Sequence, residues 1–405
     1  MTTSFTLVAP IAPSVTGNGL AMRAGMLLEC LASIGPVDLA VVPVSGPSEL
    51  SPWARQLARQ VVVAEPPTDV ASSRIHTSAQ LGDALLRDRL TRTQPLPDRV
   101  RRVPPTLADD VAAHLADAPD RIVVAMREYL APMGLRLAAA LRARRVVIDL
   151  DDDAETVLRQ LGDDAEADAY GRLARVWFGD ADALTAASDA EAHAMTERYG
   201  MEVDALPNAA RLPTTTAERP RKNRLLLVGN LTYEPNVDAA LRLVDDVLPL
   251  VRSEHPTATV TLVGAVDDRL DRLRGRPGVE ITGQVPDVAP FYDDADLVVV
   301  PLRAGAGTRI KVLEAMAHHR PVVATPIAVA GLGLRDGVDV VVAEGPDAMA
   351  RAVASLFDDP ARWSEVADAA FATVTRDHTV ESVAPILRRI VLGADDHPSP
   401  RSHQA

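Results

Sequence analysis

Cysteine and aromatic residues are scarce in this chain of 405 residues. Cys30 is the single cysteine, which excludes an internal disulfide and argues against a thiolate metal site. Aromatic residues make up 3% of the chain, so the core must be built from Ala, Val and Leu. No apolar run approaches the roughly 20 residues that cross a bilayer, so no transmembrane segment is expected and only peripheral membrane contact stays open.

Basic charge is also in short supply, since the net charge is -14 at pH 7. The sequence has no basic stripe interleaved with aromatics, so nucleic acid is not expected as a partner. The first residues lead into an apolar run without a positively charged segment, which predicts no signal peptide and a cytoplasmic protein. Of the 42 basic residues only Lys222 and Lys311 are lysines, a usage that suggests a GC-rich bacterial genome.

The second of these lysines lies in the most informative segment, Gly305–Ala317. This segment follows the strand-like run Leu297–Leu302 and turns through two glycines into a helical pattern. Backbone N–H groups at a helix N-terminus, beside Arg309 and Lys311, suit a phosphate or a diphosphate. An ordinary amphipathic helix is the alternative, although cations at a helix N-terminus oppose the helix dipole. Glu314 lies about one helical turn further on, where it can accept hydrogen bonds from a sugar hydroxyl pair.

Strand signals alternate with helical signals along both halves, which predicts an α/β fold of two doubly wound parallel sheets. Residues 207–223 carry Pro, Thr and charge in place of the apolar pattern and are expected to be a linker. The expected N-terminal domain is 1–206 and the expected C-terminal domain is 224–378. A helix at 379–394 is expected to pack back toward the N-terminal domain, and the polar tail 395–405 to be disordered.

The expected strands of the first half are Thr6–Ala9, Val37–Val44, Val61–Ala64, Ile122–Met126, Val146–Leu150, Ala183–Ala186 and Val203–Leu206. Those of the second half are Arg224–Val228, Thr259–Val263, Val279–Thr282, Leu297–Pro301, Val322–Ala324 and Val338–Val342. Residues 66–106 are poorly periodic and predict short helices and loops. Ligands of open parallel sheets bind at the carboxyl ends of the strands, so a cleft between the two domains is the expected site.

Four motifs give the second half its resemblance to a known family. They are Leu225–Leu231, Thr282–Val288, Tyr292–Leu302 and the run Gly307–Ala317, which continues into Arg320–Thr325. Their order and spacing resemble the donor domain of the retaining GT-B glycosyltransferases of family 4. The resemblance implies a GT-B fold, in which two Rossmann-like domains face each other across a cleft. It also implies that the C-terminal domain binds a nucleotide sugar and the N-terminal domain the acceptor, without a metal or other cofactor.

The resemblance also implies roles for the donor-binding residues. It assigns Glu314 to the nucleotide ribose, because a carboxylate accepts hydrogen bonds from both vicinal hydroxyls. It places Gly229 and Asn230 under the donor phosphates. The remaining donor-binding positions are the backbone of Thr282, Gly283 and Val285 at the base edge, and Gly305, Ala306, Gly307, Thr308 and Ile310 around the phosphates and sugar.

Two departures from the family pattern concern the sugar and the diphosphate. Family members carry Glu-x7-Glu, but Ala306 stands at the first position, so the backbone around it is expected to hold the sugar. Many members carry an arginine and a lysine after the glycine that corresponds to Gly229, whereas the run that begins with Asn230 has neither. Arg309 and Lys311 are therefore expected to neutralise the leaving diphosphate and to be the catalytic cations.

The N-terminal half offers weaker candidates. The amides of Gly17-Asn18-Gly19 precede a helix and are expected at the donor phosphate or the acceptor hydroxyl, a tight turn being the alternative. Arg127 and Glu128 follow the strand Ile122–Met126 and are expected to point into the cleft. Related enzymes carry a histidine near this strand end, and Arg127 stands in its place. Glu128 is a candidate contact for the sugar or the acceptor, and a surface charge is the alternative.

An acidic run, Asp149-Leu150-Asp151-Asp152-Asp153, lies near a strand end. Carboxylates of this kind can hold a divalent cation, but an N-cap with first-turn acids explains the run without a metal, and that interpretation is favoured. Asp149 and Asp151 are candidates for binding an acceptor amine or hydroxyl. His318 and His319 are expected on the solvated face of a helix.

Together these features predict a glycosyltransferase that transfers a sugar from a nucleoside diphosphate sugar to a hydroxyl or amine with retention of configuration. Retention is implied by the resemblance alone. The expected acceptor is a small molecule or lipid-linked, and the expected assembly is a monomer or homodimer. A GT-B nucleotide-sugar epimerase is one alternative. A non-catalytic nucleotide-sugar-binding partner of another transferase is the other, and Ala306 favours it.

Overall fold

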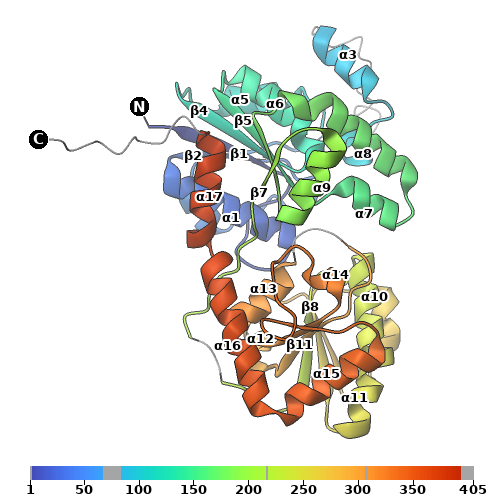
Figure 1. Ribbon diagram of the computed structural model, residues 1–405. Coiled ribbons are helices and arrows are strands. Elements are labelled where there is room, and N and C mark those ends of the chain that lie inside the picture. Colours follow the sequence, from blue (N-terminus) through green and yellow to red (C-terminus); the bar gives the residue numbers. More distant parts are fainter. Residues whose placement is uncertain (1, 67–83, 216–217, 306–308, 394–405) are drawn as a thin grey trace, which may run out of the picture.

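Two parallel sheets, each covered by helices on both faces, make up the protein (Figure 1). The computed structural model describes residues 2–66, 84–215, 218–305 and 309–393. The first sheet has seven strands in the order β3-β2-β1-β4-β5-β6-β7, and the second has six in the order β10-β9-β8-β11-β12-β13. In each sheet the strand order runs one way from the first strand and then the other way from its opposite side. This is the doubly wound pattern that the βα alternation predicts.

The first sheet separates two apolar layers, because successive side chains of a strand point to opposite faces. Phe5 and Leu7 belong to one buried cluster and Val8 to the other. Its strands are β1 (Ser4–Ala9), β2 (Val37–Val41), β3 (Ala58–Val63), β4 (Arg121–Met126), β5 (Arg145–Asp151), β6 (Ala183–Ala186) and β7 (Val203–Ala205). The helices between them are α1 (Gly19–Ile34), α2 (Pro52–Leu57), α3 (Ala84–Arg92), α4 (Asp98–Arg102), α5 (Leu107–His114), α6 (Ala131–Ala140), α7 (Ala154–Gln160), α8 (Asp164–Trp177) and α9 (Asp189–Tyr199).

The second sheet is built in the same way from shorter strands. These are β8 (Arg224–Val228), β9 (Thr259–Val263), β10 (Val279–Gly283), β11 (Leu297–Val300), β12 (Val322–Ala324) and β13 (Val341–Val342). Its helices are α10 (Glu234–Arg242), α11 (Leu248–Glu254), α12 (Ala289–Asp294), α13 (Ile310–Ala317), α14 (Pro326–Val329), α15 (Pro346–Asp358) and α16 (Pro360–Asp377). Side chains of α10, α11 and α15 pack on one face and side chains of α12 and α13 on the other, while α16 contributes to both clusters.

A strand overlaps each range expected to form one, but several ends differ. β2 stops at Val41 rather than Val44, because Pro43 has no N–H for the ladder. β3 begins at Ala58, earlier than expected, and β13 keeps only two residues of Val338–Val342. Within 84–106 the structure has α3 and α4, in keeping with the short helices expected there.

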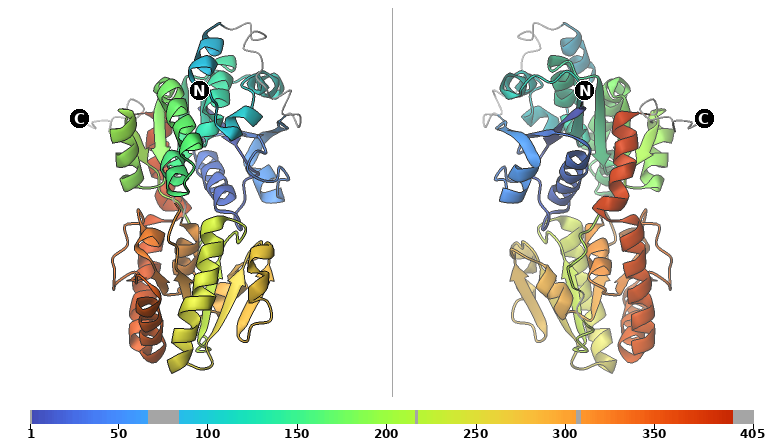
Figure 2. Two further views of the ribbon diagram at one scale, coloured as in Figure 1. Left: turned by 90° about the vertical axis from the view of Figure 1, so that its right-hand side faces the viewer. Right: turned by 90° about the vertical axis from the view of Figure 1, so that its left-hand side faces the viewer.

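The chain crosses between the two sheets twice, at points that lie together. Ala210 N donates to His378 O at 2.8 Å, and His378 Nδ1 lies 3.0 Å from Asn208 O. After this point α17 (Val380–Leu392) packs on α1, and its Leu387 belongs to the buried cluster of the first sheet. Figures 1 and 2 show the last helices, in red, running from the lower to the upper domain. Among the described residues, no helix is long and apolar enough to cross a membrane.

Candidate functional site

The carboxyl ends of the two sheets face each other. Figure 1 shows α13 and α14 at the end of the lower domain that faces the upper one. Arg309, which follows β11, has its Nη1 3.9 Å from Oε1 of Glu191 in α9. A Cβ added at Gly331 would lie 2.5 Å from Oγ of Ser188, the N-cap of α9. The loops after β6, β11 and β12 therefore meet where the sequence places the ligand.

Arg309 is a fixed cation at this meeting point. Its Nε and Nη2 donate to Ile327 O at 3.2 and 3.0 Å, and Nη2 also donates to Gly305 O at 3.2 Å. Burial lowers the pKa of Arg309, while Glu191 and Asp152 of the other domain oppose that shift. The expected donor-loop residues Ala306, Gly307 and Thr308 lie outside the described residues.

Lys311 lies in the first turn of α13, with its ammonium over the end of β8. Its Nζ donates to Asn236 Oδ1 at 2.5 Å. A Cβ added at Gly229 would lie 3.1 Å from that Nζ, so the glycine leaves room for the ammonium. Burial and the neighbouring Arg309 lower the pKa of Lys311 to about 8, and Glu314 opposes the shift. The structure thus brings Gly229 and Lys311, which are far apart in sequence, into contact.

A buried tyrosine, Tyr292, positions the carboxylate of Glu314. The hydroxyl of Tyr292 donates to Glu314 Oε2 at 3.1 Å. Tyr292 is fully buried and stacks on His318 at 5.0 Å between ring centroids. Burial raises the pKa of Glu314 to about 7, although Tyr292 and Lys311 pull it down. The residues at positions i and i+3 of a helix share a face, so the Lys311 and Glu314 side chains lie on one side of α13.

The expectation for His318 is wrong. α13 ends at Ala317, and His318 is the buried C-cap, with its Nδ1 3.0 Å from Oδ1 of Asp293. His319 follows in the left-handed region at φ 60°.

The ends of β8, β9 and β10 form the rest of this edge. Asn230 Oδ1 accepts hydrogen bonds from the N–H and the hydroxyl of Thr232, at 3.1 and 2.8 Å. Gly283 ends β10 in the left-handed region at φ 73°, and Thr282 Oγ1 donates to its carbonyl oxygen at 2.8 Å. Sheet order puts β10 two strands away from β8, so Thr282, Gly283 and Val285 lie to the side of Lys311.

In the first domain, the Gly17-Asn18-Gly19 turn begins α1. Asn18 is the N-cap, and its Oδ1 accepts a hydrogen bond from Leu20 N at 2.8 Å. One turn later, the fully buried Arg23 donates to both oxygens of Asp149, at 2.8 and 2.5 Å. This pair fixes the start of α1 at the carboxyl edge of the sheet.

The acidic run after β5 is built into the domain. Asp149 is 1% exposed and also accepts a hydrogen bond from Thr185 Oγ1 at 2.6 Å. Both of its oxygens are therefore engaged inside the fold, which does not fit the acceptor contact expected for it. Asp151 is buried in the left-handed region at φ 65°, with its Oδ1 3.4 Å from Arg23 Nε. Asp153 caps α7, as the N-cap interpretation predicts.

Arg127 and Glu128 are more buried than the expected cleft residues should be, at 7% and 5% exposed. Arg127 adopts φ 67° at the end of β4 and pairs with Asp151 and Asp152. Glu128 Oε1 accepts a hydrogen bond from Ala154 N at 3.3 Å. Burial raises the pKa of Glu128, and Arg127 opposes the shift. Both side chains bind the acidic loop of their own domain, because the left-handed turn at Arg127 directs them there.

Three residues of this site were missed by sequence reasoning. Asn236 lies in a Pro-Asn pair, a placement that turn chemistry explains in large part. Tyr292 lies in a recognised motif, but nothing in the motif shows which residue its hydroxyl reaches. Glu191 approaches Arg309 only because the two domains meet, and no local pattern signals that.

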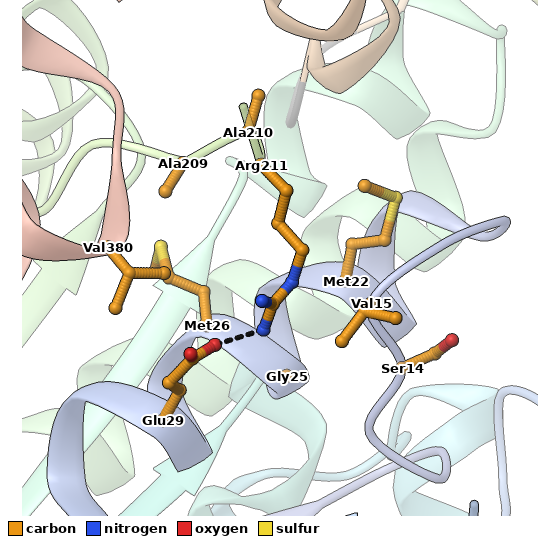
Figure 3. Close-up of a pocket in the computed structure, with 10 residues that line it drawn as sticks. All are labelled: Ser14, Val15, Met22, Gly25, Met26, Glu29, Ala209, Ala210, Arg211 and Val380. Carbon is orange, nitrogen blue, oxygen red and sulfur yellow. Dashed lines mark hydrogen bonds and ion pairs between the residues drawn. The ribbon is translucent and has the colours of Figure 1, made fainter. Parts of the chain in front are cut away.

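One cavity lies between the start of α1 and the chain that links the domains, and another lies within the first domain. Figure 3 shows the smaller, about 20 Å³, beside the ion pair of Arg211 with Glu29. That volume suits about one water molecule, so it belongs to the connection between domains and not to a substrate. The larger, about 460 Å³, lies between α3, α6 and Trp177. No group of three or more His, Cys, Asp or Glu within the described ranges is arranged to hold a metal ion.

Comparison with known proteins finds a family match within the second domain. Residues 222–359 match the family Glycosyl transferases group 1. The glycogen synthase of Mycobacterium tuberculosis is 30% identical over 246 residues, which are 55% of this chain and 57% of that protein. The phosphatidyl-myo-inositol mannosyltransferase of the same organism is 33% identical over 164 residues, 38% of this chain and 41% of that protein. The chain thus spans about half the length of the curated relatives it matches.

Among solved structures, HepE of Anabaena in complex with UDP and glucose is similar over both domains. Its TM-score is 0.65 at 15% identity, with 95% of this chain and 98% of that chain covered. This likeness confirms the GT-B fold, with its two parallel-sheet domains.

Proposed function

We propose that this protein transfers a sugar from a nucleoside diphosphate sugar to a hydroxyl or amine of an acceptor, with retention of configuration. The observation that carries the proposal is the arrangement at the end of β11. Lys311 lies beside the glycine turn that ends β8, Arg309 lies two residues before it, where the domains meet, and Glu314 follows on the same helix. These residues fall within the match to the glycosyltransferase family, and the UDP bound in HepE agrees with a nucleoside diphosphate donor.

Each of these groups has a distinct proposed task. The diphosphate lies between Arg309 and Lys311, and the first amides of α13 donate to its oxygens. Glu314, ionised, accepts hydrogen bonds from the two ribose hydroxyls. As the bond from the sugar C1 to the phosphate oxygen breaks, negative charge grows on the leaving diphosphate. Cations fixed in place stabilise that charge more than they stabilise the ground state, so they accelerate the step.

Retention follows if the acceptor attacks from the face that the diphosphate leaves. The acceptor oxygen or nitrogen then forms the new bond to C1 while its proton passes to a phosphate oxygen of the leaving group. The first domain supplies the acceptor side, because its carboxyl edge faces Arg309. In this scheme Arg309 and Lys311 neutralise the diphosphate, so turnover should persist when divalent cations are removed by a chelator.

The test begins with a thermal-shift panel of nucleoside diphosphates and nucleotide sugars. A ligand at 100 times its dissociation constant adds about 2.7 kcal/mol to the free energy of unfolding, enough to identify the donor. The donor is then incubated with and without candidate acceptors, and the anomeric configuration of the product is read by NMR. Conversion of the donor alone into an isomer would mark an epimerase. Binding without hydrolysis or transfer would leave only a binding partner.

A further inference from the structure

The ammonium of Lys311 is held by one neutral side chain from a different helix. Lys311 Nζ donates to Oδ1 of Asn236, 75 positions earlier in the chain, at 2.5 Å. Nδ2 of Asn236 donates to Asn230 O at 2.9 Å, which fixes the amide oxygen on the side of the lysine. Asn236 lies in the first turn of α10 and is 9% exposed. Its orientation is therefore set by the main chain of the β8–α10 turn.

Gly229 completes this arrangement. A Cβ added there would lie 3.1 Å from Lys311 Nζ and 3.2 Å from Asn236 Nδ2. Both side chains therefore lie against the same main-chain position, at the carboxyl end of β8. Ligands of parallel sheets bind at such an edge, so the lysine is held at the place where an anion would approach.

The charge of the partner matters as much as its position. The titratable groups that face Lys311 are Arg309 and Glu314 from its own segment and Tyr292 from α12, whose hydroxyl oxygen lies 3.4 Å from Lys311 O. A carboxylate at position 236 would pair with the ammonium and cancel its charge. An amide oxygen orients the same ammonium and leaves its full charge for an incoming phosphate.

We propose that Asn236 is a positioning residue for the donor diphosphate, which it serves by holding the Lys311 ammonium above Gly229 without adding a negative charge beside it. This inference rests on the proposed function, because it requires a diphosphate at this edge. The pairing explains why the β8–α10 turn needs no basic residue of its own. Asn236 at the start of α10 supplies the oxygen that accepts the hydrogen bond, and Lys311 of α13 supplies the cation.

The pH dependence of binding separates this role from a merely structural one. The Asn236 oxygen accepts a hydrogen bond from the charged form of Lys311 and so favours it. Its removal in Asn236→Ala lowers the Lys311 pKa further, so diphosphate binding is lost at a lower pH than in the parent protein. Asn236→Asp, nearly the same size, places a carboxylate there and raises that pKa, so the loss moves to higher pH.

The experiment measures the affinity of the four common nucleoside diphosphates by calorimetry between about pH 6 and about pH 9. We expect Asn236→Ala to weaken the tightest of them about tenfold near pH 7, and Asn236→Asp to weaken it as well. The two variants should shift the alkaline limb in opposite directions. Asn223→Asp is the matched control: Asn223 precedes β8 at the opposite edge of the sheet, where its amide contacts Thr257, and the change adds the same charge.

A double-mutant cycle completes the test. If Asn236 acts through Lys311, Asn236→Ala should cost nothing more in a Lys311→Met background. Additive losses, or an unmoved alkaline limb in both variants, would overturn the inference while leaving the donor site in place. If the parent protein itself binds none of the four nucleoside diphosphates, the proposed function fails, and this inference falls with it.

Discussion

At the scale of single residues, the two lysines provide a matched pair. Lys222 precedes β8 at the amino edge of the second sheet, where its Nζ lies 2.5 Å from Asp294. Lys311 lies at the carboxyl edge. Lys311→Met removes one of the two cations proposed to stabilise the leaving diphosphate, so we expect kcat to fall on the order of 10²–10³-fold, as for the loss of an oxyanion-hole donor. Lys222→Met should leave kcat unchanged.

Folding of both variants is checked by thermal unfolding. Equal kcat in Lys311→Met and the parent protein would remove this lysine from the mechanism, whatever its effect on stability.

The pair formed by Lys311 and Glu314 predicts a bell-shaped pH profile. Burial raises the pKa of Glu314 to about 7, so the carboxylate that we propose accepts hydrogen bonds from the ribose is gained as the pH rises through that value. Burial lowers the pKa of Lys311 to about 8, so its charge is lost as the pH rises further. kcat/KM for the donor should therefore peak between these values.

Glu314→Gln tests the assignment of the acidic limb. The amide does not titrate, so the variant should lose the rise in kcat/KM on the acidic side and keep the fall on the alkaline side. An acidic limb that survives in the variant belongs to another group.

At the scale of secondary structure elements, the β8–α10 turn depends on a missing side chain. Gly229→Ala brings a methyl group to 3.1 Å from Lys311 Nζ, and the lysine is the neighbour with freedom to move. We expect donor KM to rise several-fold while the melting temperature changes little. Gly179→Ala is the control, because a Cβ there meets only Met201 Sδ, at 3.9 Å. A large fall in melting temperature with unchanged KM would contradict this.

The elements themselves were largely predictable, because buried parallel strands are short apolar runs between turn residues. The helix α13 that comes after β11 follows from the helical periodicity of its residues. The directions of side chains at strand ends were not predictable. Arg127 and Asp151 both adopt the left-handed region, at φ 67° and 65°, and turn toward each other. The position of Arg127 after a strand therefore predicted that the residue lies at the carboxyl edge of the sheet, but not that its side chain is buried.

At the scale of the whole molecule, the site depends on contacts that no local pattern contains. Asn236 and Tyr292 reach α13 from two other helices of the same domain. Resemblance to a family assigns a role to Glu314, but it could not point to Asn236 and Tyr292, because their positions are fixed by how the helices pack. The contact between Glu191 and Arg309 is still harder to predict from sequence, because it also depends on how the two domains are placed relative to each other.

That interdomain contact yields a prediction about ligand binding. Glu191 and a donor diphosphate would both be drawn to the guanidinium of Arg309, so the carboxylate competes with the ligand. In Glu191→Gln the competition ends, while Ile327 O and Gly305 O still orient Arg309. We expect nucleoside diphosphate affinity to rise about two- to fivefold, the range for a partly exposed ion pair, and the gain to shrink at high salt.

Glu197→Gln is the matched control, because Glu197 lies on the same helix α9, is exposed, and lies 3.4 Å from His193. Both changes remove one negative charge from the first domain, so a general effect of net charge would raise affinity equally in the two variants. A local competition raises it only in Glu191→Gln. Weaker binding in that variant would mean instead that Glu191 holds the domains in the arrangement the donor needs, and that its contact with Arg309 assists closure rather than opposing the ligand.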